Sequence, residues 1–209
     1  RYIMGLYEVL GRIFTPRPHI LFESCSSGGN RFDLGMLCYS PQVWASDDTD
    51  PIERLDIQGG LSYLYPQSTM GAHVSAAPHQ QTLRDTPLST RFNVAAFGVL
   101  GYELELKYMT SAELKELRGQ IAFYKKHRKT LQYGRFYRFD EHKANKLHWQ
   151  VSSKDGKEHI VGHFQKLCTA SEGYDTLSVH GLEPSAKHHL VCKRQSLFVK
   201  RLGGLVKHV

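Results

Sequence analysis

The chain has 209 residues, of which 41% are hydrophobic and 22% are charged. This composition fits a folded globular protein with one sizeable core, with or without a small satellite domain, and excludes a disordered or fibrous chain. No apolar run approaches the roughly 18 residues that a membrane-spanning helix needs, so we expect no membrane partner. The sequence has no Met start and no signal-like segment at Arg1, so we expect Arg1 to lie inside a longer polypeptide.

The net charge of +7 is concentrated in the last third of the chain. Residues 1–131 carry 14 Lys and Arg against 13 Asp and Glu, whereas residues 132–209 carry 13 against 7, together with 8 of the 12 histidines. Because these charges are scattered, they predict solvated faces and no nucleic-acid partner; a polyanion site on this basic tail is the alternative. The four cysteines, at positions 25, 38, 168 and 192, lack the spacing of a disulfide framework, which favours a reducing cytoplasm.

The first 65 residues predict one helix and then alternating strands and helices. Residues 2–13 have apolar side chains at spacings of three and four, which predicts a helix with one buried stripe. Residues 19–25, 42–46 and 61–65 are short apolar runs that predict strands buried on both faces. Pro51 opens a helical stretch through residue 57. The stripe of the first helix comprises Ile3, Leu6, Leu10 and Ile13.

The next segment continues the alternation, and the tail changes character. Residues 94–100 suit either a strand or a helix, and the capping-box sequence at residues 110–113 predicts the start of a long helix. After residue 132, short β-type runs at 136–139, 147–151, 159–164 and 189–192 are separated by turns such as 154–157. We therefore predict an α/β unit with a parallel sheet over residues 1–131 and an antiparallel β domain over residues 132–209. Four strands are too few for an eight-stranded barrel of about 250 residues, so the unit is either a small open sheet or half of a barrel.

Polar residues follow the predicted strands, where parallel α/β folds place their chemistry. Cys25, Ser26 and Ser27 follow one strand, the acidic run 47–50 follows the next, and His73 follows the third. At least one of Asp48, Thr49 and Asp50 is expected to cap the helix that Pro51 opens. That role does not explain Asp47. An aromatic wall such as Trp44 favours the protonated form of a carboxyl, so Asp47 is a candidate general acid.

Three other kinds of chemistry fit the same residues less well. Clustered aspartates can hold a divalent cation, but the run lacks the spacing of an EF-hand, and we predict no metal and no cofactor. The loop Cys25-Ser26-Ser27-Gly28-Gly29 could bind phosphate through its amides, but it lacks the P-loop pattern. Cys25 with His73 could form a nucleophilic pair, although cysteine is commonly a small buried apolar residue. The residues alone therefore indicate an acid–base group in a parallel α/β fold, without naming a substrate.

The sequence strongly resembles the α-galactosidases of glycoside hydrolase family 36. The resemblance is carried by residues 19–75, which contain Cys-Ser-x-Gly-Gly followed by Trp-x-Ser-Asp-x-Thr-Asp, and by residues 1–10, 97–106 and 121–138 in the family's order. It implies the second half of a (β/α)₈ barrel over residues 1–131, followed by the C-terminal antiparallel β domain. It also implies retaining hydrolysis of α-galactosyl groups of melibiose- and raffinose-type oligosaccharides by two carboxylates about 5–5.5 Å apart.

The resemblance also implies roles for individual residues. Asp47 matches the family's acid/base, Cys25 to Gly28 (Cys25, Ser26, Ser27 and Gly28) match the loop that contacts the galactose hydroxyls, and Trp44 lines the site. The family's nucleophile is the Asp of a Lys-Trp-Asp-x-Asn motif, but no Trp-Asp pair occurs here, since the only tryptophans are Trp44 and Trp149. We therefore expect the nucleophile to lie before Arg1 and this chain alone to be inactive. Smaller departures are Ser27, where many relatives carry Gly, and His79-Gln80-Gln81, where Asn-His-Gln is common.

Other expectations and alternatives follow from the same resemblance. The complete protein is expected to be a cytoplasmic homo-tetramer that binds an α-galactoside oligosaccharide. The alternatives are a related α-N-acetylgalactosaminidase or galactosyl-transferring enzyme, and a catalytically dead fragment.

Overall fold

The protein is described here by a computed structural model. The structure describes residues 1–25, 32–139, 145–167, 170 and 176–192. A four-stranded parallel sheet with the order β1-β2-β3-β4 is followed along the chain by a three-stranded antiparallel sheet with the order β5-β6-β7. The predicted combination of a parallel and an antiparallel sheet is thus confirmed, while the division into two domains at residues 131 and 132 stays a prediction. The helices are α1 (Tyr2–Phe14), α2 (Pro51–Leu61), α3 (Leu88–Ala95) and α4 (Ser111–Tyr133), and the strands are β1 (Glu23–Ser24), β2 (Gln42–Trp44), β3 (Met70–Ser75), β4 (Val99–Glu103), β5 (Arg135–Phe139), β6 (Lys146–Ser152) and β7 (His159–Gln165).

The parallel sheet has two different faces. Ala72 and Val74 of β3 are fully buried and join the core formed with α3 and α4. Because side chains alternate along a strand, Gly71 and His73 point to the opposite face. In the register of the sheet, Trp44 of β2 is paired with Gly71, so Trp44 lies on that opposite face too. This opposite face therefore carries Trp44 and His73, which belong to the candidate site.

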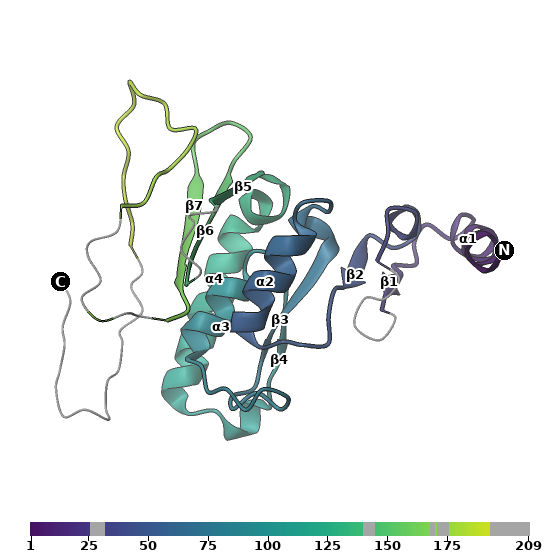
Figure 1. The fold of residues 1–209 in the computed structure, drawn as a ribbon, viewed down its shortest axis with the longest axis horizontal. Helices are drawn as coiled ribbons and strands as arrows, with labels where there is room; N and C mark the ends of the chain where they lie inside the picture. Colours follow the sequence, from purple (N-terminus) through teal and green to yellow (C-terminus); the bar gives the residue numbers. More distant parts are fainter. Residues whose placement is uncertain (26–31, 140–144, 168–169, 171–175, 193–209) are drawn as a thin grey trace.

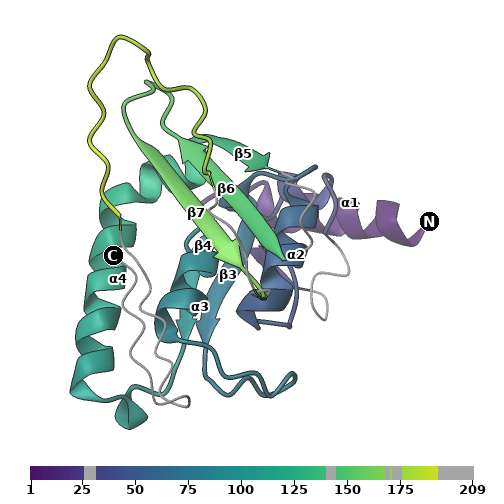
Figure 2. The same cartoon turned by 60° about the vertical axis from the view of Figure 1, so that its left-hand side comes forward.

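The antiparallel sheet shares its core with the α/β unit. Phe97, which follows α3, makes edge-to-face contacts with Trp149 and Phe164 at centroid distances of 5.5 and 6.1 Å. Leu131 of α4 and Val151 of β6 belong to the same buried cluster. Figure 2 shows the second sheet lying across α4 and the first sheet. This packing explains why the runs that become β5, β6 and β7 form strands, because each buries apolar side chains against the α/β unit.

Two boundaries follow from local sequence signals. Asp50 is the N-cap of α2, with its side chain accepting from the backbone N–H groups of Ile52 and Glu53. Thr110 and Glu113 form the predicted capping box of α4. Both helix starts were therefore predictable from the sequence, because capping depends on residues within one turn.

Several sequence predictions were wrong. The predicted strand 19–25 is only Glu23–Ser24, and residues 61–65 are the end of α2 and a turn, not a strand. The third strand is instead β3, so His73 lies inside a strand and not beyond its end. Residues 189–192 form no strand. In each case a short apolar run was taken for a strand, although pairing with a neighbouring strand decides whether such a run becomes one.

Helix α1 was predicted correctly, but its apolar stripe is not buried within the chain. Leu10 is 7% exposed, whereas Ile3 and Ile13 are 45% and 43% exposed. Figure 1 shows α1 and β1 at one end of the molecule, away from α3, α4 and the second sheet. No helix among the described residues is long and apolar enough to cross a membrane.

Candidate active site

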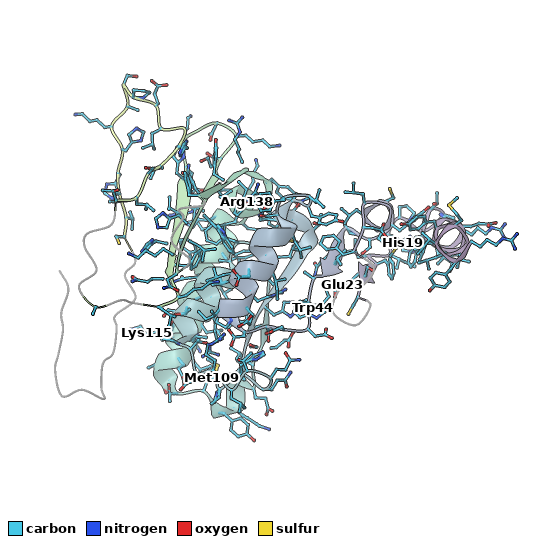
Figure 3. All side chains as sticks on the ribbon, in the orientation of Figure 1. His19, Glu23, Trp44, Met109, Lys115 and Arg138 are labelled. Carbon is cyan, nitrogen blue, oxygen red and sulfur yellow. The ribbon has the colours of Figure 1, made fainter. Side chains whose placement is uncertain are left out.

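The candidate site is built around the loop that follows β2. Asp47 is exposed, and its Oδ1 accepts a hydrogen bond of 2.9 Å from the indole Nε1–H of Trp44, the last residue of the strand. Figure 3 labels Trp44, which projects from the region between β1 and β3. The predicted pairing of these two residues at a strand end is thus present in the structure. An exposed carboxylate held by one donor has lone pairs left for a substrate.

The other two aspartates of the acidic run turn inward and support the loop. The backbone N–H of Asp48 donates to the Ser46 hydroxyl at 3.1 Å, and the N–H of Asp50 donates to Asp48 Oδ1 at 3.0 Å. Asp50 is fully buried, whereas Asp47 is exposed. The loop therefore separates one outward carboxylate from two that hold the backbone in place.

Asp50 is held by more than its helix. Its carboxylate accepts hydrogen bonds from the Thr82 hydroxyl and from Arg84 Nη1, both at 2.5 Å, in addition to the two helix N–H groups. Burial by itself raises the pKa of Asp50, but the bonds from Thr82, the Ile52 N–H and Arg84 outweigh it and lower the pKa below its usual value. Asp50 is consequently a charged structural group at neutral pH, as the capping prediction required.

His79 is a supporting residue that sequence reasoning missed. It is 3% exposed, its Nε2 lies 2.9 Å from the Thr49 hydroxyl, and its Nδ1 lies 3.3 Å from the Thr82 backbone nitrogen. It thus joins the acidic loop to the segment that follows β3. The sequence singled out His79-Gln80-Gln81 only as a departure from the family pattern, and no local spacing connects position 79 with position 49.

The indole of Trp44 contacts residues from two other elements, β3 and α2. The ring centroids of Trp44 and His73 lie 4.4 Å apart, and the guanidinium carbon of Arg54 lies 5.0 Å from the Trp44 ring. His73 Nδ1 is 2.6 Å from Glu103 Oε1 on β4. Gly101, which is paired with His73, has no side chain, and a Cβ there would collide with the imidazole. The structure therefore places His73 against Trp44 and Glu103, while its pairing with Cys25 stays a prediction.

Of the predicted sugar-contacting loop, only Cys25 is among the described residues. Cys25 is exposed and follows β1 directly. It lies one residue beyond Ser24, which is paired with Val43, so Cys25 and Trp44 occupy the same level of neighbouring strands. Ser26, Ser27 and Gly28 lie outside the described residues, and their roles stay predictions. Among the residues that the structure describes, no three His, Cys, Asp or Glu side chains are grouped as metal ligands.

The sequence and the fold are those of a glycoside hydrolase family. Residues 1–134 match the family model described as Melibiase. The chain is 45% identical over 191 residues to α-galactosidase AgaA of Geobacillus stearothermophilus and 42% identical over 194 residues to α-galactosidase Mel36A of Lactobacillus acidophilus. The chain belongs to the Melibiase family and, within it, groups with the family 36 α-galactosidases.

Solved structures give the same result. The α-galactosidase from Lactobacillus brevis superposes on this chain with a TM-score of 0.84 at 50% identity. The match covers 88% of this chain and 25% of the Lactobacillus brevis chain. A variant of AgaA solved in complex with raffinose gives a TM-score of 0.83 at 46% identity, covering 87% of this chain and 26% of its own. The chain spans about a quarter of the length of the relatives that it matches.

Proposed function

We propose that this chain is the acid/base part of a retaining α-galactosidase that cleaves terminal α-galactosyl groups from melibiose- and raffinose-type oligosaccharides. The observation that carries the proposal is the Trp44–Asp47 pair: an exposed carboxylate at the carboxyl end of a parallel strand, hydrogen-bonded by an indole. The 45% identity to α-galactosidase AgaA and the raffinose complex of that enzyme support the substrate class.

In the proposed mechanism, protonated Asp47 gives its proton to the glycosidic oxygen while that oxygen leaves the anomeric carbon. A nucleophilic carboxylate forms the covalent galactosyl-enzyme in the same step. Asp47, now ionised, then removes a proton from a water molecule, whose oxygen bonds to the anomeric carbon and releases the nucleophile. Cys25, Ser26, Ser27 and Gly28 would contact the galactose hydroxyls, and Trp44 would line the site.

The nucleophile is proposed to lie in polypeptide before Arg1, together with the first strands of a (β/α)₈ barrel of which β1–β4 form the second half. Two features support this part of the proposal. Among the described residues, strand β1 pairs on one side only, with β2. The neighbouring helix α1 exposes apolar side chains such as Met4, at 72%. The first test is the coding sequence upstream of Arg1: an in-frame Lys-Trp-Asp motif within about 100 residues, as half of a barrel of about 250 residues requires, supports the proposal. A start codon directly before Arg1 contradicts it.

The role of Asp47 is tested by its dependence on the leaving group. In the complete protein, Asp47→Asn should lower kcat/KM for raffinose by about 10²–10⁴-fold, because the sugar leaving group needs a proton. An activated aryl α-galactoside needs none, so its cleavage should fall far less. Asp85→Asn, which neutralises another exposed carboxylate, is the matched control and should leave both rates unchanged. Equal losses on both substrates in Asp47→Asn would exclude the acid/base role.

The complete protein is further proposed to be a cytoplasmic homo-tetramer. This proposal rests on the family resemblance and on cysteines without disulfide spacing. Size-exclusion chromatography with light scattering on the complete protein tests the assembly, and a monomeric mass would contradict it.

A further inference from the structure

Arg54 is an unusual residue for its position next to the site. It is 2% exposed, and its only side-chain hydrogen bond among the described residues runs from Nη2 to the Gly71 carbonyl oxygen at 2.6 Å. Its Nε and Nη1 have no hydrogen-bond partner there. Burial lowers the pKa of Arg54 to about 10, and the negative charges of Asp48 and Glu103 oppose that shift. A buried cation with two unpartnered nitrogens costs stability, so the presence of arginine at this position needs a reason other than packing.

Within the described part of the chain, this guanidinium lies over one aromatic ring, the indole of Trp44. The guanidinium carbon lies 5.0 Å from the ring centroid, within the range of a cation–π interaction, which is strongest for tryptophan and for desolvated cations. Since Gly71 is paired with Trp44 in the sheet, the Gly71 carbonyl holds the guanidinium at the level of the indole. Arg54 thus fixes the ring of the residue that contacts Asp47.

The indole bond distinguishes the two oxygens of Asp47. An indole N–H can only donate, so the oxygen that it contacts must keep a lone pair toward it. That oxygen is Oδ1, at 2.9 Å. When Asp47 is protonated, Oδ1 therefore remains the carbonyl-type oxygen and the proton resides on Oδ2.

We propose that Trp44 determines which oxygen of Asp47 carries the catalytic proton, and that Arg54 is the positioning residue that holds the indole for this purpose. This inference rests on the proposed acid/base role of Asp47. In the first half-reaction the proton passes from Oδ2 to the glycosidic oxygen, which keeps the electron pair of the broken carbon–oxygen bond. In the second, Oδ2 takes a proton from the attacking water. The N–H bond to Oδ1 is unchanged in both steps, so the carboxyl group does not need to rotate.

The first experiment is Trp44→Phe in the complete protein, which removes the N–H and keeps an aromatic ring. The kcat/KM for raffinose should fall about 10- to 100-fold, as for the loss of one oriented donor, while an activated aryl α-galactoside should lose less than about threefold. The control is Trp149→Phe, which removes the other indole N–H of the chain from the core, where it has no role in proton transfer. It should change stability but leave the ratio of the two rates unaltered. Equal losses on both substrates in Trp44→Phe would overturn the proposal.

The second experiment tests Arg54 by its effect through Trp44. Arg54→Met should reproduce the selective loss on raffinose at a smaller magnitude, and Arg54→Lys, which keeps the charge, should restore part of it. Because both residues act on the same bond, the double variant with Trp44→Phe should be no slower than Trp44→Phe alone. Additive losses, or losses that are equal on both substrates, would assign Arg54 a structural role only.

Two further measurements distinguish a folding defect from a failure of the inference. Thermal unfolding and the Kd for 1-deoxygalactonojirimycin, a compound found bound to the relative AgaA, report whether a variant retains its fold and sugar site. If Arg54→Met fails to fold, Arg54→Lys is measured in its place. A loss of kcat/KM for raffinose alone then supports the proposal, and an equal loss on both substrates overturns it. Asp47→Asn is measured on the same substrates: if it lacks the leaving-group signature, the proposed function fails. If it shows the signature and Trp44→Phe does not, only the present inference fails.

Discussion

The two ends of the α/β unit differ in how their apolar side chains are used. The N-terminal arm is defined as residues 1–25 and 32–39, and its buried apolar residues are Leu10 and Met36. Helix α1 contacts other residues of the arm, as where the rings of Phe14 and Phe22 stack with their centroids 4.6 Å apart. In the region from β3 to β7, one continuous cluster joins helices and both sheets. Leu21 in the arm is 85% exposed, whereas Val74 in the core is fully buried.

This difference indicates what each region requires. An amphipathic helix gains its stability mainly by burying its apolar stripe, and exposed apolar patches mark surfaces that contact other polypeptide. The region from β3 onward has such a partner within the chain. In the arm, Ile3 and Ile13 of α1 stay exposed among the described residues, which agrees with the proposal that further barrel strands precede the arm.

The largest effect that separates the two regions is catalytic. We expect the 209-residue chain alone to release no galactose from raffinose or from an activated aryl α-galactoside, because the proposal places both the nucleophile and the surface that covers the arm before Arg1. The complete protein should turn over both substrates. Turnover by the pure chain, measured as released galactose, would contradict the placement of the nucleophile before Arg1.

The next effect is on stability. Phe97→Ala should lower the free energy of unfolding of the chain by about 3–5 kcal/mol, because Phe97 contacts Phe136, Trp149 and Phe164 in the shared core. The matched variant in the arm is Ile3→Ala, which should change that free energy by less than about 0.5 kcal/mol, since Ile3 is 45% exposed. Urea unfolding measures both.

The comparison becomes sharper when Ile3→Ala is repeated in the complete protein. If the arm is covered there, the cost should rise to about 2 kcal/mol or more, as for a buried isoleucine. A cost that stays near zero in the complete protein would show that the stripe of α1 is not an internal surface of the barrel.

The smallest effect concerns the loop between the two regions, and it depends on pH. Arg84→Met should cost about 1–2 kcal/mol at pH 7, since it removes a charged hydrogen bond from buried Asp50; the 38% exposure of the Arg84 side chain limits the loss. The pKa of Asp50 is lowered in the folded protein, so this stabilisation is fully present above about pH 4, the unfolded value, and is lost as pH falls through the folded pKa. The difference between the variant and the natural chain should therefore shrink in acid.

Unfolding of both proteins at pH 7 and near pH 3 measures this dependence. Arg118→Met, on the exposed side of α4, is the control and should show no such change with pH. A difference that is constant across this range would contradict the assigned role of Asp50.

Features that depend on a few neighbouring residues were predictable from the sequence alone. The caps at Asp50 and Thr110, the turn at residues 154–157 and the pairing of Trp44 with Asp47 all depend on contacts within a few positions. The two kinds of sheet were predictable from the order of strand-like and helix-like segments along the chain. The resemblance of residues 19–75 also identified the family correctly. These signals depend on neighbouring residues, so a single sequence is enough to detect them.

The tertiary structure decided what depends on distant partners. Within the part of the chain that the structure describes, residues 61–65 and 189–192 pair with no strand, whereas β3 forms between β2 and β4. The contacts of Arg54 with Gly71 and of His79 with Thr49 join positions 17 and 30 residues apart, and the burial of these groups exists only once the strands and helices have packed. Burial and long-range pairing are properties of the assembled chain, because desolvation and hydrogen-bond geometry are set by residues that the sequence places far apart.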